Sequence, residues 1–284
     1  MDIIKSYWNE ILNNLPEQQE EQWLARKIEG MRERGSRVSQ ATFHIIPYHR
    51  VTYEAVDERS YLLAIRLYVK DGARSYVEEG IYSCRGRIEH NQLIENMTIT
   101  EKNISDRSIE ALPFFEEAGN EVSRFNYDRR EAVRYAEQWW DSYNPAYMNF
   151  ENNCTNYISQ CLRAGGAPVW GHPHRGKGWW YGGKTWSYSW TVANAMRWYL
   201  SGARKGLVAI EVQSADELSP GDVICYDFEG DGRYDHTTIV VSKDSEGEPL
   251  VNAHTTNSRQ RYWKYEDSTA YTPNIKYKFF KIGG

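Results

Sequence analysis

The residues best suited to chemistry are a cysteine at the start of a predicted helix and a histidine at the start of a predicted strand. Cys154 follows Asn152 and Asn153, both common helix N-caps, and opens a run with apolar or small residues at helical spacing. The free backbone N–H groups and the dipole of a first helical turn favour a thiolate over a thiol. Cys154 is therefore the predicted nucleophile.

A cysteine nucleophile needs a base, and His236 stands where one is wanted. It begins the predicted strand 236–241, and the predicted strands 223–226 and 250–254 lie before and after it in the chain. Adjacent antiparallel strands would bring His254 or Asn252 beside His236, where either could fix the tautomer of its ring. The sequence thus predicts a Cys–His–polar constellation, with His254 favoured and Asn252 the alternative as third member.

Two metal sites are possible alternatives, one made of the same residues and one in the loop before His236. Cys154, His236 and His254 could together bind zinc, but the chain has no short ligand spacing such as HExxH. The loop 227–235 begins like a calcium loop, yet its twelfth position is Thr238 where a bidentate Glu is needed. We predict a plain hairpin loop and neither a metal nor a cofactor; removing calcium with a chelator would test the loop.

A second feature is the tryptophan-rich segment 170–198, in which Trp179, Trp180 and Tyr181 lie between glycines. These three rings either line a groove, where they would stack on a sugar or a peptide, or fill the core beside the cysteine helix. We predict that they bind substrate together with Asn153.

Several ordered blocks resemble the "putative amidase" domain of spore-forming Gram-positive bacteria, a relative of the NlpC/P60 and CHAP cell-wall peptidases with a papain-like core. The resemblance extends over roughly residues 124 to 284 and rests on the blocks 153–166, 180–181, 187–193, 220–223, 235–236 and 254–257. It implies that Cys154 is the nucleophile, His236 the base and His254 the orienting residue. Asn153 departs from the pattern, because the residue before the cysteine is usually Asp in such proteins.

The resemblance also implies a substrate, a peptide or amide bond of bacterial peptidoglycan that is cut through a thioester. The segment 1–10 has no basic stretch followed by an apolar one, so we expect no standard export signal. A cytoplasmic location remains open, as does release or spore deposition by another route. The alternatives are a cytoplasmic cysteine peptidase or deamidase of another amide, or a catalytically silent module that binds ligands in the aromatic groove.

The composition argues against some classes of partner and against a membrane span. The net charge of −5 argues against nucleic-acid binding, and no run approaches the roughly 18 apolar residues of a membrane-spanning helix. The four cysteines form no CxxC pair, and we interpret Cys161 and Cys225 as buried apolar residues. The oligomeric state is left open.

The length favours two domains. Residues 1–31 have helical spacing, and turns are predicted at 57–59 and 71–72 within a meander. The strand-like runs of that meander are 42–56, 61–69, 76–88 and 91–100. The boundary is predicted near 101–123, where the polar run 101–107 is followed by the interruptions Pro113 and Gly119-Asn120.

We therefore predict an α+β fold in two parts. Residues 1–110 would form an accessory domain of unknown role, a helix with an antiparallel meander. Residues 111–284 would form a papain-like, NlpC/P60-type domain of helices packed on an antiparallel sheet, and the helix 128–140 would lead the chain towards Cys154.

Overall fold

The computed structural model of the protein describes residues 1–15, 21–99 and 125–283. Over these residues the fold is α+β, as the sequence predicts, with six α-helices and a large antiparallel sheet. The strand order of that sheet is β1-β2-β3-β11-β10-β9-β8-β12-β7, and β4 also pairs with β3. No helix in these ranges is both long enough and apolar enough to cross a membrane.

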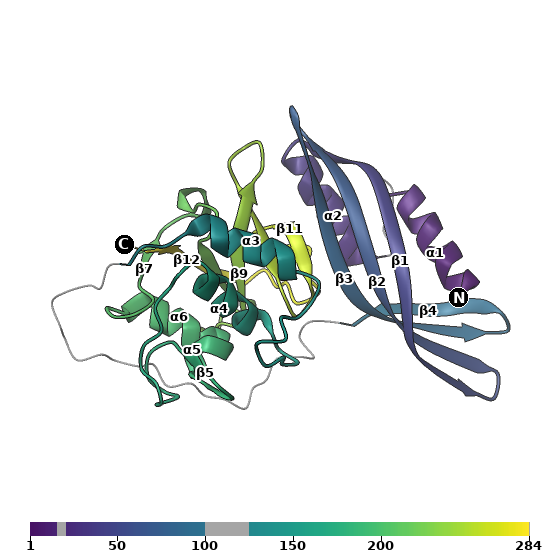
Figure 1. Cartoon of the computed structure of the whole chain (residues 1–284). Helices are drawn as coiled ribbons and strands as arrows, with labels where there is room; N and C mark the ends of the chain where they lie inside the picture. The colour runs from purple at the N-terminus through teal and green to yellow at the C-terminus, as the bar shows by residue number, and fades with distance from the viewer. Residues whose placement is uncertain (16–20, 100–124, 284) are drawn as a thin grey trace.

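The N-terminal lobe, residues 1–99 as far as they are described, packs two helices against a meander of three long strands and a shorter fourth (Figure 1). Its elements are α1 (Asp2–Asn13), α2 (Gln22–Glu33), β1 (Ser36–Tyr53), β2 (Val56–Asp71), β3 (Arg74–Glu89) and β4 (Gln92–Thr98). Apolar helix residues at three- and four-residue spacing, such as Ile4, Trp8 and Leu24, meet alternate strand residues such as Leu63 and Leu67.

The predicted meander is confirmed, but one of its turns is displaced. β1 and β2 pair from Ser36 opposite Asp71 to Tyr53 opposite Val56, so the chain reverses at residues 54–55. The predicted turn at 57–59 is wrong, because those residues already belong to β2. Glu54 takes the left-handed conformation that this tight reversal needs, which a glutamate does not advertise in the sequence.

The C-terminal lobe, residues 125–283, is built around the other half of the sheet (Figure 1). Its helices are α3 (Arg129–Trp139), α4 (Cys154–Ala164), α5 (Tyr188–Thr191) and α6 (Ala193–Gly202), with a short 3-10 helix at Ala215–Glu217. Its strands are β5 (Tyr181–Gly182), β6 (Thr185–Trp186), β7 (Ala209–Val212), β8 (Val223–Asp227), β9 (His236–Lys243), β10 (Pro249–Ala253), β11 (Ser258–Tyr262) and β12 (Lys276–Ile282).

Both faces of this half of the sheet are buried, which explains why its central strands lack polar alternation. Val223, Cys225 and Ile239 pack with α3, α4 and α6 on one face. Ile224 and Val240, one residue along, belong to a second core on the other face, which the loop between β11 and β12 helps to cover. The start of α4 and the start of β9 are thereby held in fixed positions.

The two lobes share one sheet through a short junction. β11 pairs with β3 at Ser258 opposite Gly80 and at Arg259 opposite Glu79, and the N–H of Ile81 donates to the carbonyl of Asn257. The boundary predicted at 101–123 lies outside the described residues. Polar and ionic contacts flank the junction, as described below.

Candidate active site

Cys154 is the first residue of α4, as the sequence predicts. The helix is buried from Cys154 to Leu162, and it ends at the pair Gly165-Gly166, where Gly166 has a φ of +87°. Asn153 occupies the N-cap position, but its side chain does not cap the helix. The sulfur therefore lies in a first helical turn whose N–H groups are free of intrahelical partners.

His236, the first residue of β9, is the side chain that most lowers the pKa of the Cys154 thiol. Burial by itself raises the pKa of this thiol, but a hydrogen bond with His236 and the charge of its ring lower it to about 7. Hydrogen bonds from the Thr155 hydroxyl and the Thr237 backbone act in the same direction. Near neutral pH a large share of Cys154 is therefore thiolate, which is the state a nucleophile needs.

The other cysteines behave differently, because no histidine opposes their burial. Burial raises the pKa of Cys84 to about 12 and takes the pKa values of Cys161 and Cys225 well above the usual range for a thiol. Cys161 and Cys225 are fully buried, as the sequence predicts. The four thiols thus divide into one activated group and three inert ones.

Tyr265 packs against the ring of His236. Its hydroxyl is 3.3 Å from Nε2 of His236, and the two rings are 5.2 Å apart, with Tyr226 and Phe228 also against the imidazole. Tyr265 carries no motif in the sequence, because it lies in a loop between two strands, β11 and β12, that the sequence does not predict. It occupies the place next to His236 that His254 or Asn252 was predicted to fill.

His254 contacts Asn153, the residue before Cys154, but neither of its ring nitrogens contacts His236. Its Nδ1 is 2.8 Å from Nδ2 of Asn153, its Nε2 is 2.7 Å from the carbonyl oxygen of Trp139, and its ring stacks on Tyr157 at 3.9 Å. Burial lowers the pKa of His254 to about 4, so the ring is neutral at pH 7. Nε2 donates to Trp139, and Nδ1 accepts from Asn153.

Asn252 also lies away from the base. Its Nδ2 donates to Glu137 at 2.9 Å, and its Oδ1 accepts from the N–H of Gln260 at 2.8 Å. Asn252 and His254 point to the same side of the sheet, because both contact the end of α3. That side is simply not the side on which the His236 ring lies.

Asn153 joins the histidine to the cysteine turn. Its Oδ1 accepts from the N–H of Phe150 and from Nδ2 of Asn156, so its own Nδ2 is the atom that faces His254. Only 2% of Asn153 is exposed. An aspartate at this position would have no proton for Nδ1 of His254, so asparagine matches a neutral histidine here.

The predicted aromatic groove is mostly core. Trp179 and Trp180 are buried, with exposures of 0% and 1%, so neither ring is available to a substrate in this structure. Trp179 donates to Ser159 of α4 at 2.9 Å and stacks on Trp190, which itself donates to Asn156 of α4. Tyr181 is half-buried, and its hydroxyl accepts the N–H of Met148 on the approach to Cys154.

Within the part of the chain that the structure describes, no three His, Cys, Asp or Glu side chains are grouped to hold a metal. The zinc alternative needs Cys154, His236 and His254 together, and His254 is held elsewhere. In the loop 227–235, the carboxylate of Asp227 accepts the N–H groups of residues 230, 231 and 232 and so organises the loop itself.

Comparison with known proteins identifies a family for the C-terminal lobe and two relatives of the chain. Residues 126–280 match the family described as "Putative amidase domain". "Uncharacterized protein YhbB" of Bacillus subtilis (strain 168) is 51% identical over 243 residues, which cover 84% of this chain and 78% of that protein. "Uncharacterized protein YjcM" of the same strain is 31% identical over 139 residues, or 46% of this chain and 31% of that protein. No solved structure matches.

Proposed function

The chain belongs to the family described as "Putative amidase domain", and from this premise we propose that it hydrolyses amides with Cys154 as the nucleophile and His236 as the base. The family supports hydrolase activity on amides. The cysteine mechanism rests on one observation above all, a thiol in a first helical turn whose pKa the neighbouring His236 lowers to about 7 despite burial.

The reaction proceeds in two halves. His236 takes the thiol proton, and the thiolate attacks the amide carbonyl carbon, whose oxygen becomes an oxyanion held by the backbone N–H of Cys154. As the C–N bond breaks, the imidazolium returns the proton to the leaving amine, and a thioester remains. His236 then takes a proton from water, the hydroxide attacks the thioester, and a carboxylic acid leaves as the thiol is restored.

We propose that the substrate is a peptide or amide bond of bacterial peptidoglycan. We also propose that the C-terminal lobe has a papain-like core of the NlpC/P60 and CHAP type. Two features support this proposal, a cysteine at the start of a helix packed on an antiparallel sheet and a histidine at the start of a strand of that sheet. Of the residues predicted to bind substrate, Tyr181 is the best placed, because it is half-buried and its hydroxyl accepts the N–H of Met148 on the approach to Cys154. Asn153 is 2% exposed and holds the turn before the nucleophile through its contacts with Phe150 and His254.

Site-resolved labelling with a thiol-reactive probe tests the reaction class. At pH 7 we expect the probe to modify Cys154 and to leave Cys84, Cys161 and Cys225 untouched in the folded protein, because burial keeps those three as thiols. The variant His236→Ala should lose the labelling of Cys154. Equal labelling of Cys154 with and without His236 would contradict the mechanism and favour the binding-module alternative.

Incubation with purified peptidoglycan tests the substrate. Newly released amino groups are expected with the unmodified protein and not with Cys154→Ala, which keeps the fold and removes the sulfur. If Cys154 is reactive but no amine is released, the chemistry stands and another amide is the substrate.

A further inference from the structure

The loop that carries Tyr265 joins β11 to β12 and reaches from the active site to the N-terminal lobe. The Tyr265 hydroxyl is 3.3 Å from Nε2 of His236 and 3.4 Å from Oγ of Ser258. Tyr265 has a φ of +58°, a conformation that residues other than glycine rarely adopt. Such a conformation persists only where surrounding contacts impose it, so the neighbours of this loop matter.

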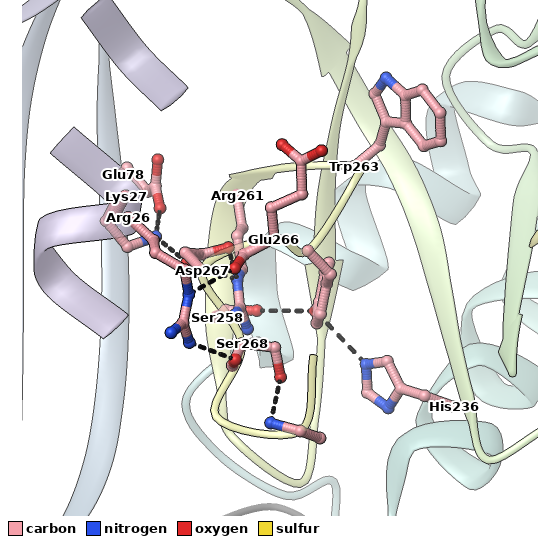
Figure 2. A network of polar contacts seen from close by, with 12 residues as sticks. Arg26, Lys27, Glu78, His236, Ser258, Arg261, Trp263, Glu266, Asp267 and Ser268 are labelled. Atoms are coloured by element: carbon pink, nitrogen blue, oxygen red, sulfur yellow. Dashed lines mark hydrogen bonds and ion pairs between the residues drawn. The ribbon is translucent and has the colours of Figure 1, made fainter. Parts of the chain in front are cut away.

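One set of contacts comes from α2. Nε of Arg26 donates to the carbonyl oxygen of Glu266 at 2.8 Å, and Nη2 donates to the carbonyl oxygen of Ser268 at 2.9 Å. Figure 2 shows that the guanidinium donates hydrogen bonds to the loop backbone on both sides of Asp267. Arg26 is itself exposed, so this grip adds no buried charge.

A buried ionic cluster holds the residue between those two carbonyls. Nζ of Lys27 is 2.5 Å from Asp267 and also pairs with Glu78 of β3, while Nε of Arg261 is 3.0 Å from the same Asp267 carboxylate (Figure 2). Burial raises the pKa of Asp267, but Arg261 and Lys27 more than reverse this and keep it ionised. Buried ions that are paired in this way tolerate little displacement, because separating them leaves an uncompensated charge.

The cluster and the strand junction both reach Tyr265. The guanidinium of Arg261 lies 3.8 Å from the centre of the Tyr265 ring. Ser258, the second partner of the Tyr265 hydroxyl, is the residue of β11 that pairs with Gly80 of β3. The N-terminal lobe therefore holds the tyrosine from two directions.

We propose that the N-terminal lobe positions the catalytic base: Arg26 and Lys27 of α2 fix the loop 263–270, and Tyr265 on that loop orients His236. This inference rests on the proposed function of Cys154 and His236. The Tyr265 oxygen accepts the Nε2 proton and its O–H donates to Ser258, which leaves the lone pair of Nδ1 as the base for the thiol. Tyr265 is a positioning residue, because it acts on the thiol only through His236.

The test is the rate of Cys154 alkylation by iodoacetamide as a function of pH, followed by mass spectrometry at each cysteine. Tyr265→Phe keeps the ring and removes one hydrogen bond to a charged group, so the midpoint should rise by about one pH unit and the rate at pH 7 should fall about fivefold. Arg26→Ala should move the midpoint in the same direction, with a loss of about threefold at pH 7. Because both act through one contact, the double variant should be no slower than Tyr265→Phe.

Two controls separate positioning from a general loss of stability. Arg32→Ala removes an arginine of the same helix that pairs with Glu29 within α2. Ser245→Ala removes a contact between the lobes, at Asp71, away from the Tyr265 loop. Both should keep the pH profile of the unmodified protein, and circular dichroism should show all four single variants folded at the temperature of the assay.

The outcomes distinguish this inference from the function on which it rests. A folded Arg26→Ala with an unchanged profile, or a double variant whose loss is the product of the two single losses, would overturn the positioning role. If Cys154 of the unmodified protein has no reactivity that depends on His236, the proposed function itself fails. Alkylation needs no amide substrate, so the wrong choice of substrate affects neither result.

Discussion

Two buried histidines lie on either side of the start of α4, and they differ in what their ring nitrogens contact. Nε2 of His236 is 3.3 Å from the hydroxyl of Tyr265, and the ring lowers the pKa of the Cys154 thiol, a group that can exchange a proton with it. Both nitrogens of His254 are taken by an amide and a carbonyl, neither of which titrates. The two residues have almost equal burial, 6% and 1% exposed.

The difference shows that two histidines of almost equal burial can be distinguished by their partners. A ring whose partners cannot accept or release a proton is locked in one tautomer, and burial then keeps it neutral. The ring of His236 has a different neighbour, a thiol whose pKa it lowers to about 7 against the effect of burial. We therefore assign His254 to holding the turn before Cys154 and His236 to acting on the sulfur, and the following predictions are designed to break that assignment.

The largest expected effect comes from the same substitution, phenylalanine, at each histidine. His236→Phe removes the group that opposes burial, so the pKa of Cys154 should rise by about two units or more, with a loss of alkylation rate at pH 7 of about fiftyfold or more. His254→Phe keeps a ring on Tyr157 but leaves Asn153 and the Trp139 carbonyl without this partner, so it should cost roughly 2 to 3 kcal/mol of stability. Alkylation rates and denaturant unfolding measure the two effects.

A crossed pattern would refute the assignment. If His254→Phe, below its unfolding transition, slowed alkylation as much as His236→Phe and left the stability unchanged, His254 would act on the sulfur after all. Full unfolding of His254→Phe at pH 7 would still agree with the structural role.

The second prediction concerns pH. Burial lowers the pKa of His254 to about 4 in the folded protein, against about 6.5 in an unfolded chain, so the unfolded state binds more protons between these values. The stability from this residue is thus fully present above pH 6.5 and lost as pH falls towards 4. The loss is roughly 2 kcal/mol at pH 5, and denaturant unfolding at pH 7 and pH 5 should show it.

Other groups titrate in the same window, so the comparison must be with a variant. Burial raises the pKa of Asp235 to about 6, which changes stability with the opposite sign. The difference between unmodified protein and His254→Phe isolates the histidine. Equal pH slopes in both proteins would mean that His254 titrates normally and is not locked by its partners.

The sequence predicted the His236 side of this comparison well, because its signals are local. Cap-type asparagines and helical spacing place Cys154 at the start of α4, and turn residues place His236 at the start of β9. Apolar periodicity likewise predicted the α+β class and the four-stranded meander. The catalytic roles themselves remain predictions that the experiments above test.

The third residue needed the register of two strands, which the sequence does not contain. Asn252 pairs with Ile239, and paired residues point to the same face, here the face towards α3 and α4. His236 precedes Ile239 by three positions and so has the opposite parity, and its ring lies among Tyr226, Phe228 and Tyr265. Tyr265 could not be predicted, because its position depends on a loop that α2, more than two hundred residues earlier in the chain, holds in place.

The smallest expected effect concerns Thr155, whose hydroxyl lies beside the sulfur of Cys154. It is 3.7 Å from Sγ of Cys154 and 3.1 Å from Oγ1 of Thr237, and its hydrogen bond lowers the pKa of the thiol less than His236 does. Thr155→Val keeps the shape and removes the hydroxyl, so the alkylation midpoint should rise by about half a unit, a two- to threefold loss of rate at pH 7. Thr155→Ser retains the hydroxyl and should keep the original midpoint, since the oxygen rather than the methyl group acts on the sulfur. A Val variant as slow as His236→Phe would show that the thiolate depends on the hydroxyl network and not on the imidazole.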